Sequence, residues 1–210
     1  VESVITYKDI TGENQIGGII PDEPLLAENE IHFKGQPIAI IIAESDQLAR
    51  KARSLIHVEY TILKEITDPR VAKLQGELLI PSRTFEMGNT ESNWANCEYI
   101  FEGIVENGGQ EHLYIETQGA YAIPIENTNL KIFSSTQGPT AVQKTVANLI
   151  GVPMHRIEVD VTRLGGAFGG KEDQASGFAS MVGLAAYILK KPVKISVHRH
   201  DDMVITGKRH

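Results

Sequence analysis

The stretch Arg156–Leu189, RIEVDVTRLGGAFGGKEDQASGFASMVGLAAYIL, places a strand pattern, a cluster of glycines and a helix pattern in direct succession. Its first part alternates around β-branched side chains, which favours a strand that ends near Leu164. From about Asp173 to Leu189 apolar residues recur at helical spacing, so the sequence predicts a long helix. One face of this helix is expected to carry Phe178, Val182, Ala185, Ala186 and Leu189.

The segments on either side of this stretch continue the mixture of strands and helices. Residues 112–124, HLYIETQGAYAIP, and 130–137, LKIFSSTQ, favour two strands, and 193–198, VKISVH, favours a third. The intervening TAVQKTVANLI predicts a short helix that Gly151 and Pro153 terminate. The second half of the chain therefore contains enough elements for a layered domain.

The first third of the chain predicts a smaller α/β unit. PIAIIIA, residues 37–43, is a continuous apolar run typical of a buried strand. Ser45 supplies an N-cap for a helix through DQLARKARSLI, and HVEYTIL, residues 57–63, predicts a returning strand. We therefore expect an α+β protein. Its expected parts are an α/β unit over 1–75, a connecting segment over 76–107 and a second unit over 108–210.

Composition and charge exclude several classes of protein. The hydrophobic fraction of 41% and charged fraction of 22% are those of an ordinary globular domain. Acidic residues outnumber basic ones, 27 against 20, which argues against nucleic acid as a partner. The longest apolar stretch is too short to cross a bilayer, so no membrane partner is expected. The single cysteine, Cys97, cannot form an intrachain disulfide or a four-thiolate cluster, and we expect a reducing, cytoplasmic location.

The glycine-rich turn is the most informative motif. Gly165, Gly166, Gly169 and Gly170 surround Ala167 and Phe168 between a predicted strand and a predicted helix. Such a turn lets backbone N–H groups converge on an anion or a metal oxo group, although a purely structural turn is the alternative. It is neither standard nucleotide loop. Gly165–Lys171 matches the first seven positions of the phosphate loop, but Glu172 replaces the Ser or Thr that should follow, so the match is interpreted as a coincidence. Ala167 replaces the second glycine of the dinucleotide motif.

A second candidate is GGQEHLYIE, residues 108–116. In a strand, Gln110 and His112 would face one side and Glu111 the other, so that the Gln110 amide could meet a ligand. A solvated strand start explains the same pattern. His198 and His200 could ligate a metal, but a charged surface turn is the favoured interpretation of HRHDD.

The motifs TRLGGAFGGKED and GGQEHLYIET, together with the final DDMVITGKRH, resemble the molybdenum-binding subunit of the xanthine dehydrogenase and aldehyde oxidase family. The resemblance covers almost the whole chain. FKGQPIAIIIAESDQLARKARSLIHVEY is similar to the family's small α/β hammerhead domain. The remainder resembles the first part of the molybdenum-cofactor domain, so the chain corresponds to the N-terminal part of the subunit.

The resemblance implies roles for individual residues. Gln110 is expected to contact the oxo group of the molybdenum centre. Gly166, Phe168 and Gly169 are expected to approach the metal's ligands and the pterin, so that Gln110 and Phe168 lie near the metal without ligating it. Glu172 is expected to hydrogen-bond a purine substrate. The resemblance implies no catalytic residue in this chain, because the family's glutamate base belongs to a segment beyond residue 210.

The chemistry that the resemblance implies is hydroxylation of xanthine or hypoxanthine to urate with water, hydride passing to a sulfido ligand of molybdenum. The expected cofactor is molybdenum–molybdopterin, with 2Fe–2S clusters and FAD on other domains or subunits, in an oligomeric enzyme. Ala167 stands where many xanthine-oxidising members have a third glycine, which leaves open a hydroxylase of aldehydes or other N-heterocycles, such as nicotinate. A non-catalytic docking module is the remaining alternative. By itself the 210-residue chain is expected to be inactive.

Overall fold

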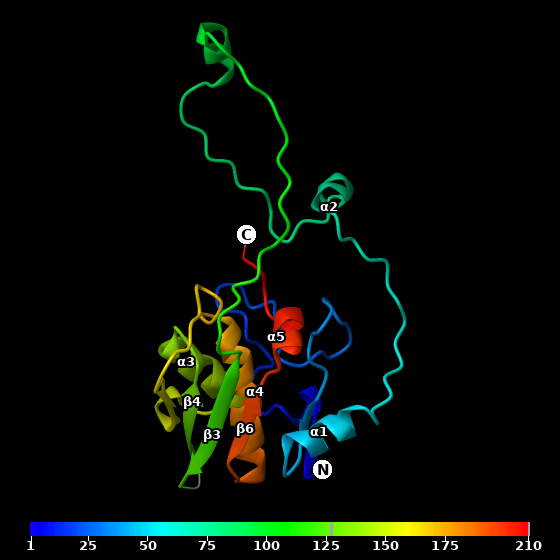
Figure 1. The fold of residues 1–210 in the computed structure, drawn as a ribbon, viewed down its shortest axis with the longest axis vertical. Coiled ribbons are helices and arrows are strands. Elements are labelled where there is room, and N and C mark those ends of the chain that lie inside the picture. The colour runs from blue at the N-terminus through cyan, green and yellow to red at the C-terminus, as the bar shows by residue number, and fades with distance from the viewer. Residues whose placement is uncertain (127, 210) are drawn as a thin grey trace. The chain divides into compact units, whose positions relative to one another are not determined.

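The computed structural model describes residues 1–126 and 128–209. The chain divides into two compact units (Figure 1). One unit combines Val1–Ile56 with the chain from Gly108 onward, and the other is His57–Asn107. Each unit is described by itself below.

A four-stranded sheet forms the centre of the first unit. Its strands are β3 (Gly119–Ile125), β4 (Asn129–Ser134), β5 (Ile157–Asp160) and β6 (Val193–Ser196). They lie side by side in the order β5-β4-β3-β6, with β3 antiparallel to both β4 and β6. β4 and β5 are parallel, so a crossover must join them, and the helix α3 (Pro139–Ile150) provides it. Mixed strand directions with helices confirm the expected α+β class.

Two helices cover one face of this sheet, α3 and α4 (Gln174–Leu189) (Figure 1). α4 is buried from Ala175 to Ala186, so its burial extends well beyond the apolar face described from the sequence. The cause is its position, because it packs against the sheet, against α3 and against residues near the N-terminus. Gly183 allows the approach of α3, since a Cβ there would lie 2.9 Å from a methyl of Val146.

The N-terminal residues of the same unit add a second, two-stranded sheet. β1 (Ser3–Ile5) pairs antiparallel with β2 (Ile40–Ile42). The helix α1 (Asp46–Arg53) follows, and the predicted N-cap is confirmed because the Ser45 hydroxyl accepts the N–H of Leu48 at 3.3 Å. The apolar side chains that join this sheet to α4 in one core are Ile5, Leu25, Leu26 and Ile42. A one-turn 3₁₀ helix, η1 (Tyr7–Asp9), follows β1.

The unit His57–Asn107 contains the helix α2 (Pro69–Gln75) and the 3₁₀ helix η2 (Glu91–Asn96). The strand predicted at 57–63 was wrong. In the described part of this unit no strand lies beside that segment, and its apolar side chains are exposed, Tyr60 by 73%. Alternating hydrophobicity gives a segment one apolar face, but a strand also needs a neighbouring strand to pair with its backbone N–H and C=O groups.

Two further elements differ from the sequence prediction. The strand expected over 112–124 begins only at Gly119, because its pairing with β6 and β4 begins there. Leu113 also leaves the extended region, with φ +48°. The segment predicted as a charged turn is the helix α5 (Arg199–Ile205), which begins after His198 and follows β6. Gly151 ends α3 in a left-handed conformation. A short 3₁₀ helix, η3 (Met154–Arg156), then precedes β5.

Candidate functional site

The loop 165–170 combines glycines with an unusual backbone. Three of its residues have positive φ: Gly166 (+95°), Phe168 (+54°) and Gly169 (+88°). For Phe168 this conformation is costly, because its Cβ crowds the backbone. Gly170 has a different reason to be glycine. A Cβ there would lie 2.8 Å from side-chain atoms of both His112 and Tyr114.

One side of this loop is open. Among the described residues, a Cβ built on Gly169 would meet no atom within 4 Å, and Phe168 is 70% exposed. The N–H groups of residues 166–169 make no hydrogen bond within the described chain, whereas that of Gly170 donates to the Ala167 carbonyl. The loop therefore leaves four backbone N–H groups without a partner among the described residues and exposes the Phe168 ring, although Ala167 itself is buried. Unpaired backbone donors in a glycine-rich loop suit an anionic or oxo-bearing ligand.

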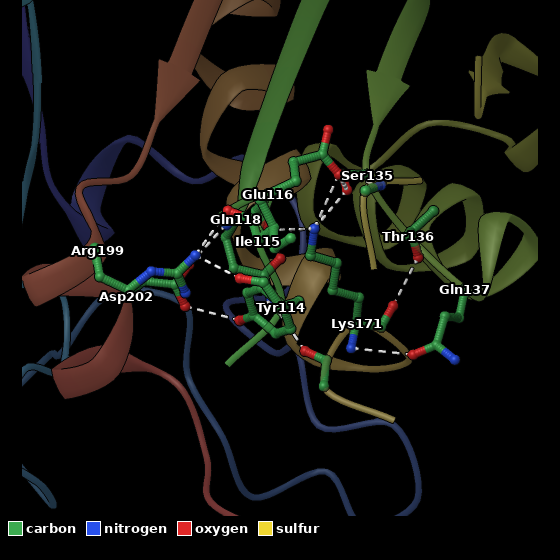
Figure 2. Close-up of polar contacts among 12 residues, drawn as sticks. Tyr114, Ile115, Glu116, Gln118, Ser135, Thr136, Gln137, Lys171, Arg199 and Asp202 are labelled. Atoms are coloured by element: carbon green, nitrogen blue, oxygen red, sulfur yellow. Dashed lines mark hydrogen bonds and ion pairs between the residues drawn. The ribbon is translucent and has the colours of Figure 1, made fainter. Parts of the chain in front are cut away.

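Glu116 and Lys171 hold the two ends of this loop. The Glu116 carboxylate accepts the N–H of Gly165 at 2.9 Å, and the Glu116 N–H donates to the Gly165 carbonyl at 3.1 Å. The fully buried Lys171 ammonium donates to the Glu116 carboxylate at 3.0 Å, to the Glu116 carbonyl at 2.8 Å and to the Ser135 hydroxyl at 2.7 Å. Figure 2 shows the Lys171 side chain reaching Glu116 and Ser135.

The charges in this cluster shift both pKa values. Burial opposes ionisation of Glu116, but hydrogen bonds from Ser135, Gly165 and Lys171 outweigh burial and lower the pKa of its carboxyl. Burial lowers the pKa of Lys171, and the neighbouring Glu116 works in the opposite direction. Hydrogen bonds stabilise this buried ion pair in addition to the attraction of its charges, because each of the three N–H groups of the Lys171 ammonium has an acceptor.

A second buried network joins α5 to the segment before β3. The buried Asp202 carboxylate accepts the Tyr114 hydroxyl at 2.7 Å and the Gln118 backbone N–H at 2.7 Å. The Gln118 amide donates to the Tyr114 hydroxyl at 3.1 Å and to the Gly170 carbonyl at 2.9 Å. Burial and the bond to Asp202 raise the pKa of Tyr114. The guanidinium of Arg199 adds a 2.8 Å bond to the Ile115 carbonyl (Figure 2).

The structure brings the two sequence motifs together through these polar residues. Glu116 and Gln118, which follow GGQEHLYI, both bond to the glycine loop. Gln110 lies at the start of that segment, where its backbone exchanges two 2.8 Å hydrogen bonds with Arg209. Among the described residues no hydrogen bond joins the Gln110 side chain to the loop. Glu172 is exposed and precedes α4 by two residues.

Sequence reasoning missed the residues that carry the site's support. Lys171 appeared only as part of a coincidental phosphate-loop match, Asp202 only as part of a charged turn, and Tyr114 only as part of a strand. The one available signal was Lys171 itself, since a lysine between a glycine-rich turn and an apolar helix needs a partner if it is buried. Within the described ranges no three His, Cys, Asp or Glu side chains gather to hold a metal ion, and His198 and His200 join no such group.

Comparison with known proteins identifies both parts of the chain. The family description "Molybdopterin cofactor-binding domain" matches residues 73–210, and "Aldehyde oxidase and xanthine dehydrogenase, a/b hammerhead domain" matches residues 1–64. The chain is 39% identical over 213 residues to xanthine dehydrogenase of Drosophila pseudoobscura pseudoobscura, covering 100% of this chain and 16% of that protein. It is 37% identical over 216 residues to aldehyde oxidase 2 of Cavia porcellus, with coverage of 100% and 16%.

A solved structure gives the same result. Aldehyde oxidoreductase from Desulfovibrio gigas superimposes with a TM-score of 0.85 at 25% identity, covering 99% of this chain and 25% of that one. The chain spans about a sixth of the length of the curated relatives, 16% in both cases above. The two family matches, in the expected order along the chain, confirm the resemblance noted in the sequence. The chain belongs to the xanthine dehydrogenase and aldehyde oxidase family, in which it forms a hammerhead domain followed by part of a molybdopterin cofactor-binding domain.

Proposed function

We propose that this chain forms part of the site of a molybdenum hydroxylase that oxidises xanthine and hypoxanthine to urate with oxygen from water. The observation that carries the proposal is the loop around Gly169, where the N–H groups of residues 166–169 have no partner among the described residues and the strained Phe168 has an exposed side chain. A strained conformation of this kind is characteristic of a ligand-binding position.

The residues present fit a molybdopterin group. The group brings its own sulfur and oxo ligands, and it needs hydrogen-bond donors and close backbone approach more than protein metal ligands. The amides of residues 166–169 are such donors, and the absence of a Cβ at Gly169 leaves room for approach. Gly166, Phe168, Gly169 and the exposed Gln110 would hold the group. When bound, it supplies a centre that accepts two electrons from the substrate.

The chain's own residues would bind the molybdopterin group, orient the purine and shield the site from water. The exposed carboxylate of Glu172 would accept a hydrogen bond from an N–H of the purine, which orients the ring. The ring of Phe168, which has little contact with its own chain, would cover the group and exclude water. Gln110 would donate its amide to an oxo ligand. None of these residues is a general base, and the base is proposed to come from another part of the enzyme.

Electrons would leave through 2Fe–2S clusters and FAD on other domains or subunits, within an oligomer. These partners are proposed from family membership, because this chain spans only 16% of its relatives. No helix among the described residues is long and apolar enough to cross a membrane. We propose the cytoplasm as the location, in line with the single, exposed, unpaired Cys97.

An aldehyde or another N-heterocycle is the second candidate substrate. The 37% identity to an aldehyde oxidase nearly equals the 39% to a xanthine dehydrogenase, so overall similarity does not discriminate between them. The choice of xanthine depends on Glu172, whose carboxylate suits a purine N–H and has no partner on a small aldehyde.

The experiment uses the full-length gene product that contains this sequence. Wild type should carry molybdenum by elemental analysis and oxidise xanthine. Glu172→Gln should lower kcat/KM for xanthine roughly ten- to a hundredfold, the effect of losing one charged hydrogen bond of about 1.5–3 kcal/mol, and leave benzaldehyde oxidation unchanged. The control is Glu91→Gln, an exposed acid in the first turn of η2, which should change neither rate. A wild type without molybdenum refutes the proposed function, and equal losses on both substrates remove Glu172 from the substrate site.

A further inference from the structure

We propose that Glu116 and Lys171 are positioning residues that clasp the glycine loop across its base and fix the backbone donors of residues 166–169. This inference rests on the proposed function, because those donors are the ones assigned to the molybdopterin group. Neither residue touches that group in the proposal. They act through the loop that lies between them.

Both ends of the loop meet at one residue. Gly165, at its start, exchanges two hydrogen bonds with Glu116, one to the backbone N–H and one to the carboxylate. Lys171, at its end, returns to the same carboxylate and to the Glu116 carbonyl. Glu116 lies 55 residues before Lys171, so this closure is a tertiary contact and not a property of the turn itself.

Lys171 is also fixed by its backbone. Its carbonyl accepts the Gln137 N–H at 2.9 Å and the Thr136 hydroxyl at 3.1 Å, and its N–H donates to the Gln137 side chain at 3.3 Å (Figure 2). These contacts attach the residue to the start of α3, while its side chain reaches Glu116 and Ser135. The lysine thus joins three segments at one buried point.

The clasp gives the loop a reason to remain strained. Phe168, a residue with a Cβ, holds φ +54° although its ring is mostly exposed and its own contacts are few. A strained residue persists only when the surrounding structure determines its conformation. With both loop ends tied to Glu116, the short span between them has few ways to close, and the positive φ values at Gly166, Phe168 and Gly169 satisfy that closure.

The test is hydrogen exchange of the full-length gene product carrying Lys171→Met, a substitution of similar length without the charge. The reporters are the hydrogen-bonded amides of Gly165, Gly170 and Lys171. Their exchange should accelerate about tenfold or more, as expected for the loss of a hydrogen bond to a charged group, while α3 and α4 exchange as in wild type. Molybdenum per polypeptide should fall in the same variant.

The matched control is Lys131→Met, which also removes a lysine–glutamate pair, 2.8 Å long, from β4 and β5 of the same unit. It should leave loop exchange and molybdenum content unchanged. If Lys171→Met accelerates no loop amide, the clasp is refuted. If it accelerates α3 and α4 as much as the loop, Lys171 serves general stability and the positioning role is refuted.

A second variant covers the case in which Lys171→Met does not fold. Glu116→Gln keeps an oxygen that can accept from Gly165 and Lys171 but removes the charge, so loop exchange should rise less than in Lys171→Met and still more than in Lys131→Met. No rise in Glu116→Gln, or a rise spread over the whole unit, refutes the clasp. A wild type without molybdenum refutes the proposed function instead, because the exchange comparison does not depend on the metal.

Discussion

Replacing Tyr114 by phenylalanine removes one oxygen from a fully buried network. The Tyr114 hydroxyl donates to the Asp202 carboxylate at 2.7 Å and accepts the Gln118 side-chain amide at 3.1 Å. The substitution keeps the aromatic ring and nearly all of its volume, so no sizeable cavity is created and the cost is that of the hydrogen bonds. Asp202 keeps its bond from the Gln118 backbone N–H and a long contact of 3.4 Å from the Thr206 hydroxyl, but it loses its 2.7 Å donor while it stays buried.

The magnitude follows from the charge on the acceptor. A hydrogen bond to an ionised group contributes about 1.5–3 kcal/mol, roughly twice that of a neutral pair. Because about 1.4 kcal/mol corresponds to a factor of ten, opening of the segment around Gln118 should become roughly ten- to a hundredfold more frequent. The Gln118 N–H is the direct reporter, since its exchange requires release from Asp202.

The assay is hydrogen exchange measured by mass spectrometry on the full-length gene product, with the peptide that contains Gln118 as the readout. Tyr121→Phe is the matched control, because Tyr121 lies on β3 in the same unit and stacks on Phe133 with ring centroids 6.0 Å apart. It should leave exchange at Gln118 nearly unchanged. Equal exchange in Tyr114→Phe and Tyr121→Phe would refute the reasoning that Asp202 fixes this segment through Tyr114.

Two further predictions concern the loop. Gly169→Ala and Gly88→Ala each add a Cβ at a similar positive φ, +88° and +80°, where no atom of the described chain lies within 4 Å. Both should therefore cost about 1–2 kcal/mol of backbone strain, but only Gly169→Ala should lower the molybdenum content measured by elemental analysis. Equal molybdenum in the two variants would contradict the loop's proposed role. Burial opposes ionisation of Glu116 but hydrogen bonds lower its pKa below 4.5, so its stabilisation of the loop is fully present above that pH and is lost as the pH falls through the lowered pKa. Hydrogen exchange of the loop amides, corrected for its intrinsic pH dependence, should therefore accelerate on acidification in wild type and not in Glu116→Gln.

Local chemistry in the sequence predicted those elements whose signals lie within a few residues. Ser45 caps α1, and Gly151 ends α3 at φ +78°. Both follow from short-range hydrogen bonds and from the freedom of glycine, so no knowledge of the tertiary structure was needed. The α+β class and the glycine loop between β5 and α4 were predicted from the apolar spacing and from the clustered glycines, which are also properties of the local sequence.

The elements that failed depend on contacts made far along the chain. The segment 57–63 has the composition of a strand, but a strand exists only with a paired neighbour. Leu113 gave no sign of its positive φ, which ends any extended run through that position. The helix α5 was also missed, because the local sequence does not show that Asp202 is buried or that it accepts a hydrogen bond from Tyr114, 88 residues away.

Lys171 shows most clearly why a site cannot be read from its own motif. Gly165–Lys171 matches the first seven positions of the phosphate loop, in which the lysine reaches outward to the nucleotide. Here the same residue is fully buried and its ammonium turns back to Glu116 and Ser135. The difference is made by the carboxylate of Glu116, because a lysine with a partner behind the loop supports the loop, and a lysine without one is available to a ligand. The glycines create the opening, but the residue that decides what the lysine does lies in another segment of the sequence.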